Sequence, residues 1–121
     1  MQIRRLRLSA LFLVATSAAF AVGPSWTDGS SKTIYYTPGS SFLDTEIYTN
    51  LYYYDNPTIS IVSGSLPPSV YLYPWSDACY NACAYLYSNG SLMSGTATYT
   101  VVLRVTKSGQ SADITVTFRP S

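Results

Sequence analysis

Apolar and polar residues alternate most regularly in the last part of the chain, between Gly95 and Pro120. Alternation with a period of two predicts half-buried β-strands. The segment 107–110 (Lys-Ser-Gly-Gln) separates two such runs and is typical of a hairpin turn. Because the apolar face of this hairpin needs a covering layer, we expect the upstream chain to supply a second sheet. The residues expected to share the apolar face are Tyr99, Val101, Leu103, Val105, Ala112, Ile114, Val116 and Phe118.

Shorter alternating stretches predict further strands upstream, separated by turns rich in Pro, Gly and Asn. We expect these strands at 32–37, 45–54, 58–62, 70–73 and 84–88. The inner positions of the second and third of these strands are expected to be Ile47, Thr49, Leu51, Tyr53, Ile59 and Ile61. No helical period is sustained after the first residues of the chain, so the pattern predicts an all-β sandwich of about seven short antiparallel strands.

The first residues are typical of a cleavable secretory signal. Arg4, Arg5 and Arg7 precede the apolar run 8–22, and Ala19-Phe20-Ala21 has the small-x-small form of a cleavage site. A retained membrane anchor is the alternative, but the run of 15 residues is shorter than the roughly 20 that a spanning helix needs. We therefore expect a signal peptide at 1–21, a leader at 22–31 and one domain at 32–121. The mature protein is then secreted, periplasmic or displayed on the cell surface, with no membrane span.

Removal of the signal changes the charge of the protein. The mature chain keeps four basic and six acidic residues, a net charge of −2. Nucleic-acid binding needs clustered Lys and Arg to neutralise phosphates, so nucleic acid is not an expected partner. All 12 tyrosines lie in the mature part.

Two segments, TISIVSGSLPPSVYLY (58–73) and 90–118, carry a resemblance to a known family. They are similar to Ig-like domains of bacterial surface and secreted proteins, which are related to cadherin-like and dystroglycan-type modules. The resemblance covers 32–119 and departs from the family pattern at Ser69, where glycine is usual, and at Ala97, where proline is usual. It implies an Ig-like β-sandwich in which Tyr99 is a corner tyrosine whose hydroxyl bonds to upstream backbone. The matching structural residues are Gly64, Leu66, Pro67, Gly90, Ser94, Gly95, Thr96 and Tyr99.

The residues that most enzymes need are scarce in this chain. It has no histidine, which excludes a Ser-His-Asp triad, a Cys-His pair and the usual zinc sites. The carboxylate pairs that could meet are Asp44 with Glu46 and Asp55 with Asp77, although nothing in their spacing requires it. The acidic runs of calcium-binding relatives are missing. We expect no enzymatic activity, no cofactor and no metal; a hydrolase that uses carboxylates alone is the enzymatic alternative.

Cys79 and Cys83 are the two cysteines of the chain. In an exported protein so close a pair predicts a local disulfide, with an intermolecular bridge as the alternative. Because an extended strand would separate the two Cα atoms by roughly 13 Å, the segment between them must turn.

Tyrosines on both sides of this cysteine pair supply the candidate binding residues. Antiparallel pairing of the flanking strands would bring Tyr71 and Tyr73 against Tyr85 and Tyr87. We expect Trp75 and Tyr80 close to these rings. The cluster has two interpretations: cross-strand packing that stabilises the hairpin, or an exposed aromatic platform that binds proteins or sugar rings. A second exposed candidate is formed by Tyr48, Tyr52 and Tyr54.

The function that these observations favour is non-catalytic binding by a secreted, single Ig-like module. Adhesion, a surface coat and carbohydrate recognition all fit this description, with a protein or a carbohydrate surface as the partner. The alternative is a structural subunit that self-associates through its edge strands.

Overall fold

The computed structural model describes residues 23–39, 43–73, 79–88 and 95–121. The expected signal peptide and Trp75 lie outside these residues. Within them, none of the helical structure is both long and apolar enough to cross a membrane. The elements are β1 (Ser31–Tyr36), β2 (Asp44–Tyr52), the 3-10 helix η2 (Tyr53–Asp55), β3 (Thr58–Gly64), β4 (Val70–Leu72), β5 (Asn81–Ser88), β6 (Tyr99–Lys107) and β7 (Gln110–Pro120).

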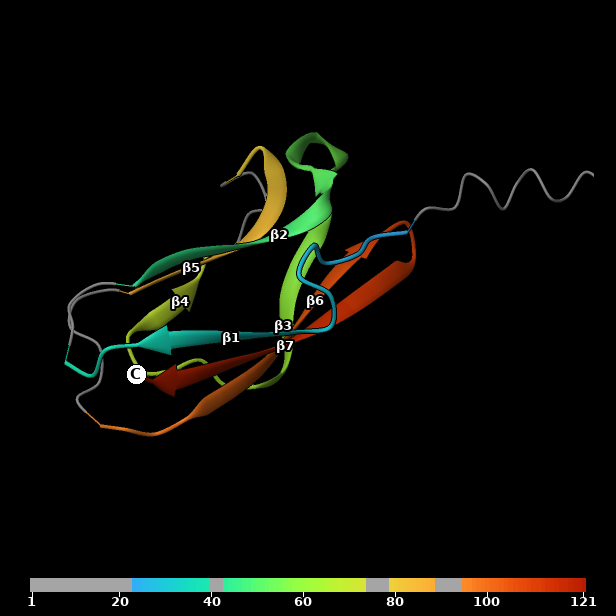
Figure 1. Ribbon diagram of the computed structural model, residues 1–121. Helices are drawn as coiled ribbons and strands as arrows, with labels where there is room; N and C mark the ends of the chain where they lie inside the picture. Colours follow the sequence, from blue (N-terminus) through green and yellow to red (C-terminus); the bar gives the residue numbers. More distant parts are fainter. Residues whose placement is uncertain (1–22, 40–42, 74–78, 89–94) are drawn as a thin grey trace, which may run out of the picture.

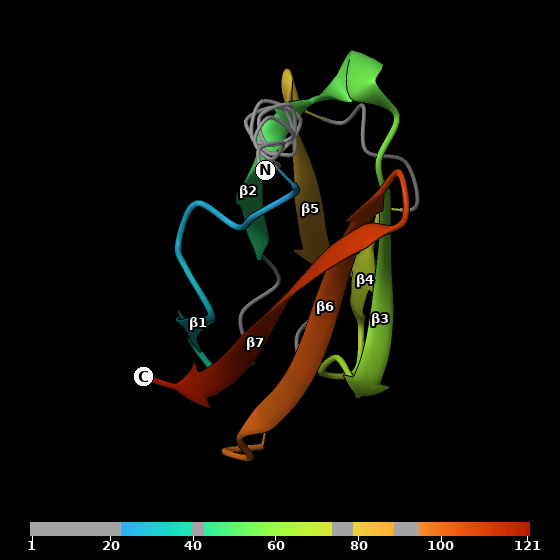
Figure 2. The ribbon, with the colours of Figure 1, turned by 90° about the vertical axis from the view of Figure 1, so that its right-hand side faces the viewer.

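The seven strands form two sheets packed face to face, which confirms the predicted β-sandwich (Figures 1 and 2). One sheet has the order β1-β7-β6-β3 and the other the order β2-β5-β4. The prediction of antiparallel pairing throughout is wrong at one place, because β1 runs parallel to β7, with Ser31 opposite Thr115. Alternation along a strand indicates which residues face inward, but it carries no information on the direction of the neighbouring strand.

The hairpin of β6 and β7 forms one wall of the core, as its alternation predicts. Six of its eight expected inward side chains are completely buried, and Tyr99 and Ala112 at the ends of the hairpin face are half-buried against the same core. Because successive side chains of a strand point to opposite faces, the same strands present polar residues to solvent. The central core residues are Ile47, Val70, Ala84, Leu86, Val101, Leu103, Val105, Ile114, Val116 and Phe118.

The segment before β1 differs from the expected leader, because it is packed onto the domain (Figure 1, blue). Trp26 is only 5% exposed and forms an isolated antiparallel bridge with Thr49 of β2. Its indole Nε1 donates a hydrogen bond of 2.9 Å to the carbonyl of Ala112 in β7. The backbone N–H of Thr27 donates to the carbonyl of Tyr48 at 2.9 Å. One residue of this segment therefore contacts both sheets, and the folded unit begins before residue 32.

Two inward positions expected from alternation are wrong. Ile61 lies opposite the buried Leu103 and faces the same side of the sheet, but it is 41% exposed on the edge strand β3. Tyr53 is 42% exposed, because β2 ends at Tyr52 and the chain turns into η2. Alternation in the sequence shows neither the edge of a sheet nor the end of a strand.

Among the described residues that carry the family resemblance, Gly64, Leu66 and Pro67 lie at the end of β3 and in the connection after it, and Gly95 lies before β6. Gly90 and Ser94 lie outside the described residues. Gly64 has φ +76°, and a Cβ there would lie 2.2 Å from the carbonyl oxygen of Thr100. Pro67 is buried, and its carbonyl accepts a hydrogen bond of 3.1 Å from the backbone N–H of Val70. Leu66 is half-buried against the core. Gly95 is exposed, with no atom near the position of a Cβ.

A tyrosine does bond to backbone at this corner, but it is Tyr36 of β1. Its hydroxyl donates to the carbonyl of Ala97, two residues before Tyr99. Tyr36 is 3% exposed, and burial raises its pKa, with a further contribution from Tyr99. Tyr99 itself is half-buried and packs against the core cluster.

We expect Trp26→Ala to lower the free energy of unfolding by about 3 kcal/mol, because the substitution removes a buried indole and leaves the half-buried carbonyl of Ala112 without this donor. Urea unfolding followed by circular dichroism measures this loss. Tyr35→Ala is the matched control, since Tyr35 is 66% exposed on β1. A loss no larger than that of the control would show that the segment before β1 is dispensable.

We expect Ser69→Gly to raise the free energy of unfolding by up to about 1 kcal/mol. Ser69 has φ 71°, a left-handed conformation that strains residues with a Cβ and that glycine adopts freely. This explains physically why glycine suits the position. Ser65→Gly is the control, because Ser65 has no positive φ. Equal effects of the two substitutions on the unfolding midpoint would contradict the prediction.

Candidate functional site

The outer face of the sheet β2-β5-β4 carries four tyrosines, here called the sheet cluster: Tyr71, Tyr73, Tyr85 and Tyr87. Tyr71 lies directly opposite Tyr87 across β4 and β5. The ring centroids are 6.0 Å apart for Tyr71 and Tyr87, 6.1 Å for Tyr73 and Tyr85, and 5.7 Å for Tyr85 and Tyr87. The expected convergence of these four rings is confirmed. Tyr71 is 47% exposed and the other three are half-buried, so the cluster is open to solvent.

Carboxylates of β2 border the sheet cluster. Asp44 lies opposite Tyr87, and Glu46 lies opposite Tyr85. The pKa of the Tyr85 hydroxyl is raised above its ordinary value, and the largest cause is its hydrogen bond to Asp44. Partial burial and the charges of Asp44 and Glu46 raise the pKa further. The hydroxyl therefore stays a donor to Asp44 at neutral pH. The predicted pair Asp44 and Glu46 shares one face, whereas Asp77 of the other pair lies outside the described residues.

Charge is divided between the two sheets. All four basic residues in the part of the chain that the structure describes lie on β1, β6 and β7, away from the sheet β2-β5-β4. Two of them are paired with acidic residues: Lys32 with Asp28 at 3.1 Å, and Arg104 with Asp113 at 2.8 Å. The guanidinium of Arg104 holds the pKa of Asp113 below its usual value. The tyrosine-bearing sheet therefore has only acidic charges among its described residues.

A second group of rings, here called the tip cluster, lies at one end of the sandwich: Tyr52, Tyr53, Tyr54 and Tyr80. Tyr52 and Tyr54 are stacked, with centroids 5.2 Å apart and planes 8° apart. Tyr80 contacts Tyr52 edge-on at 5.4 Å. Partial burial raises the pKa of Tyr54, and the neighbouring Tyr80 and Tyr52 add to the effect. The prediction that Tyr80 joins the sheet cluster is wrong, because its ring contacts are with the tip cluster.

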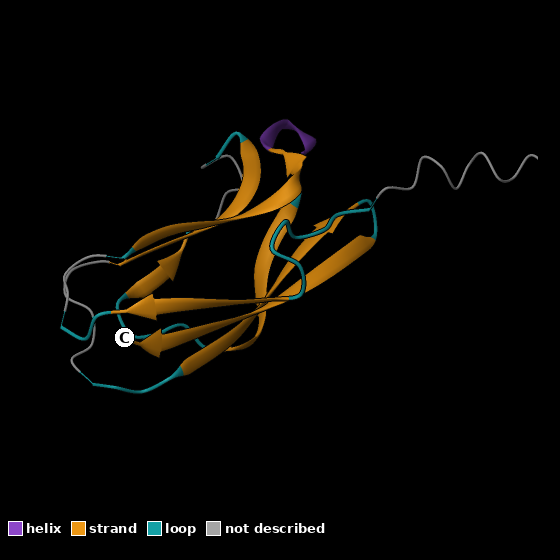
Figure 3. Ribbon diagram, in the orientation of Figure 1, coloured by secondary structure: helices purple, strands orange, loops and turns teal. Residues whose placement is uncertain are grey.

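The start of β5 and η2 lie side by side at this end of the molecule (Figure 3). The backbone N–H of Tyr53 donates a hydrogen bond of 3.0 Å to the carbonyl of Tyr80. Just before η2, the backbone N–H of Tyr52 donates to Oδ2 of Asp55 at 2.9 Å. Just after η2, Asn56 ends the turn with φ 53°. The exposed fractions of the four rings range from 40% for Tyr52 to 66% for Tyr80. The tip cluster is thus an exposed group of rings on a hydrogen-bonded backbone.

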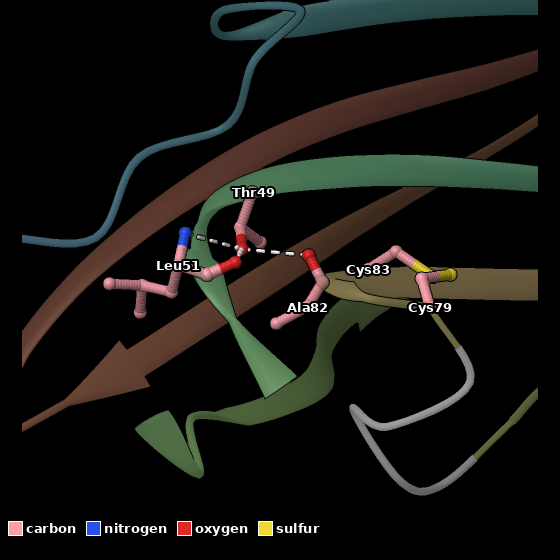
Figure 4. Close-up of a disulfide and its surroundings, with 5 residues drawn as sticks. All are labelled: Thr49, Leu51, Cys79, Ala82 and Cys83. Carbon is pink, nitrogen blue, oxygen red and sulfur yellow. Dashed lines mark hydrogen bonds between the residues drawn. A yellow bond between two sulfur atoms is a disulfide. The ribbon is translucent and has the colours of Figure 1, made fainter. Parts of the chain in front are cut away.

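The buried hydroxyl of Thr49 forms hydrogen bonds between β2 and the start of β5 (Figure 4). The pairing of β2 with β5 changes register between Tyr48 and Tyr52. Within this irregularity, Thr49 is 2% exposed; its Oγ1 donates to the carbonyl of Ala82 at 2.7 Å and accepts from the N–H of Leu51 at 3.1 Å. The Thr49 side chain thus forms hydrogen bonds with backbone groups of Ala82 and Leu51 where the regular pairing of β2 with β5 is interrupted.

The disulfide between Cys79 and Cys83 is local, as predicted, with a Cα–Cα distance of 5.8 Å (Figure 4). It encloses Tyr80, Asn81 and Ala82 in a short ring at the start of β5. Closing a loop of this size stabilises the folded chain by about 2 kcal/mol in the loop-entropy model. The bridge therefore restricts the segment that presents Tyr80.

A pocket of about 520 Å³ lies between the two clusters. Its lining includes Thr27, Glu46, Tyr48, Cys79, Tyr80 and Asn81. Sequence reasoning placed Tyr48 among exposed aromatics but missed the pocket, because Thr27 belongs to the segment expected to be a leader. Alternation does put Glu46 and Tyr48 on one face of a strand, and this was the available signal.

A metal centre has no support in the part of the chain that the structure describes, where no group of three or more His, Cys, Asp or Glu side chains is placed to hold an ion. The chemistry available at the clusters and the pocket consists of aromatic faces, hydroxyls, carboxylates and an amide. These groups bind through stacking and hydrogen bonds.

No family model matches the chain, and no curated protein matches it in sequence. Among solved structures, the fold is similar to part of an endo-fucoidan hydrolase of glycoside hydrolase family 107. The TM-score is 0.57 at 13% sequence identity, and the similarity covers 82% of this chain. It covers 14% of the hydrolase, so the chain spans only a small part of that enzyme's length. At this identity the similarity establishes the β-sandwich fold alone.

We expect Asp44→Asn to lower the pKa of Tyr85, because the substitution removes the charged acceptor of its hydroxyl proton. In the native protein the raised pKa stabilises the folded state at pH values below the ordinary tyrosine pKa. This stabilisation is lost as the pH rises through the pKa of Tyr85 in the folded state. Titration of the tyrosine ring carbons by NMR measures the change. Glu46→Gln should produce a smaller shift, since Glu46 acts through charge alone. Equal shifts in the two variants would contradict the assignment.

Proposed function

We propose that this protein is an exported, non-catalytic binding module whose sheet cluster recognises the sugar rings of a carbohydrate. The observation that carries the proposal is the group of four solvent-facing tyrosines across β4 and β5, bordered by Asp44 and Glu46. Aromatic faces carry partial negative charge and attract the slightly positive C–H groups of a sugar ring. Carboxylates next to them accept hydrogen bonds from sugar hydroxyls.

The position of the sheet cluster supports a role beyond folding. The core is supplied by the inner face of β5, including Ala84 and Leu86, so the rings of Tyr85 and Tyr87 are not needed to fill it. Cross-strand ring contacts do stabilise β4 against β5, by about 0.2 to 1 kcal/mol for each pair. That contribution does not require four tyrosines on one open face. Aromatic surface left in contact with water is a common mark of a binding site.

Two further observations agree with an exported binding module. The local disulfide fits an oxidising compartment outside the cytoplasm. The similar part of the endo-fucoidan hydrolase shows that such a sandwich occurs within a carbohydrate-active enzyme, which is support at the level of fold only. We also propose membership in the Ig-like family, supported by Gly64, Leu66 and Pro67 in the connection after β3.

Self-association through strand edges is the weaker candidate. The free side of β2 is occupied by the segment before β1, through the bonds between Thr27 and Tyr48 and between Ser25 and Asn50. The edge strand β3 contains a bulge, β4 has only three residues and β1 carries Lys32. Each of these features hinders the addition of a further strand.

We expect Tyr71→Ala and Tyr87→Ala each to weaken binding of a recognised polysaccharide about tenfold, with little change in the unfolding midpoint, because each removes one stacking surface from an exposed cluster. Affinity electrophoresis against laminarin, glucomannan, xylan and fucoidan identifies the polysaccharide, and calorimetry measures the loss. Tyr71→Phe should keep most of the affinity, and Tyr35→Ala on the other sheet is the control. Unchanged binding in both alanine variants would refute the proposal.

A further inference from the structure

The pocket beside β2 connects the two tyrosine clusters. Glu46 lines it and is also the register partner of Tyr85 in the sheet cluster. Tyr80 also lines it and belongs to the tip cluster. Tyr48 follows Glu46 two positions along β2 on the same face. Sheet cluster, pocket and tip cluster therefore follow one another along β2 as a continuous strip.

The pocket has the size and the chemistry of a small-ligand site. Its volume of about 520 Å³ falls within the roughly 300 to 1,000 Å³ that such sites occupy. The rings of Tyr48 and Tyr80 supply flat surface, while Glu46, Asn81 and Thr27 supply a carboxylate, an amide and a hydroxyl. Hydroxyl-rich ligands can both donate to and accept from this set of groups.

The length and the charge of the strip limit what it can bind. Eight residue steps along β2 separate Asp44 from Tyr52, which corresponds to about 26 Å of strand. A ligand that contacts both clusters must therefore be an extended chain. No basic residue lines the pocket, and Asp44 and Glu46 are exposed beside the path. Sulfate or carboxylate groups of an anionic chain would be repelled there.

We propose that the pocket and the tip cluster form a second subsite, continuous with the sheet cluster, and that the whole strip binds an extended, uncharged glycan chain. This inference rests on the proposed carbohydrate-binding function. A chain long enough to occupy both subsites gains affinity because its second contact is intramolecular. The residues that the inference adds to the site are Glu46, Tyr48, Asn81 and Tyr80.

Calorimetry with the trisaccharides and hexasaccharides of the laminari-, cello- and manno- series tests the inference. In the native protein the preferred hexasaccharide should bind about tenfold tighter than its trisaccharide. Tyr80→Ala and Asn81→Ala should remove this advantage, so that the hexasaccharide and the trisaccharide bind with similar affinity. Tyr35→Ala is the matched control, because Tyr35 and Tyr80 have the same exposed fraction of 66% and lie on different sheets.

The contribution of charge is tested with laminarin, glucomannan and xylan and with their chemically sulfated forms. We expect each sulfated form to bind at least about tenfold more weakly than its parent, with partial recovery in Glu46→Gln.

The outcomes separate the inference from the function on which it rests. Binding that depends on Tyr71 but is equal for the two chain lengths, or unaffected by Tyr80→Ala and Asn81→Ala, overturns the second subsite alone. Tighter binding of the sulfated polymers overturns the assignment of an uncharged glycan. Absence of binding to all of these polymers and oligosaccharides overturns both the inference and the proposed function.

Discussion

The exclusion of water from one face of the β6–β7 hairpin is the constraint on which the rest of the domain depends. Side chains such as Leu103, Ile114 and Phe118 are completely buried, because the second sheet covers them. That sheet contributes Ala84 and Leu86 from β5. Since a strand alternates its faces, burying these two residues turns Tyr85 and Tyr87 outward. The same packing that stabilises the sandwich therefore displays the aromatic rings to solvent.

The features that the sequence predicts correctly are those set by neighbours along the chain. The alternation of β6 and β7, the disulfide from Cys79 to Cys83, and the meeting of the four tyrosines on β4 and β5 all depend on local spacing. What the sequence does not reveal depends on partners far along the chain. The indole of Trp26 is held by a residue 86 positions away, and the parallel direction of β1 is decided by the last strand. A position at the edge of a sheet, such as Ile61 of β3, also fits the apolar pattern while its side chain stays partly exposed.

The candidate site likewise has a part that local spacing predicts and a part that depends on distant residues. The sheet cluster follows from two alternating strands, so its residues are predictable. Tyr80 is not, because the turn enforced by the disulfide directs its ring toward η2 and away from β4. The pocket requires the contact between Thr27 and β2, together with the register change that the hydroxyl of Thr49 stabilises. The candidate binding groups thus lie where irregular backbone meets a regular sheet. The alternation of apolar and polar residues in the sequence does not predict such a place.

The ladder between β1 and β7 has a consequence for how the chain reaches this structure. The first strand of the domain pairs with the last, and the indole of Trp26 reaches the last strand as well. Contacts between such distant residues close large loops, and domains dominated by them fold slowly, on a scale of milliseconds to seconds. The four-stranded sheet cannot be completed before β7 is present. A nascent chain therefore stays without its full core until β7 has been synthesised, and its apolar strands remain exposed to other proteins up to that point.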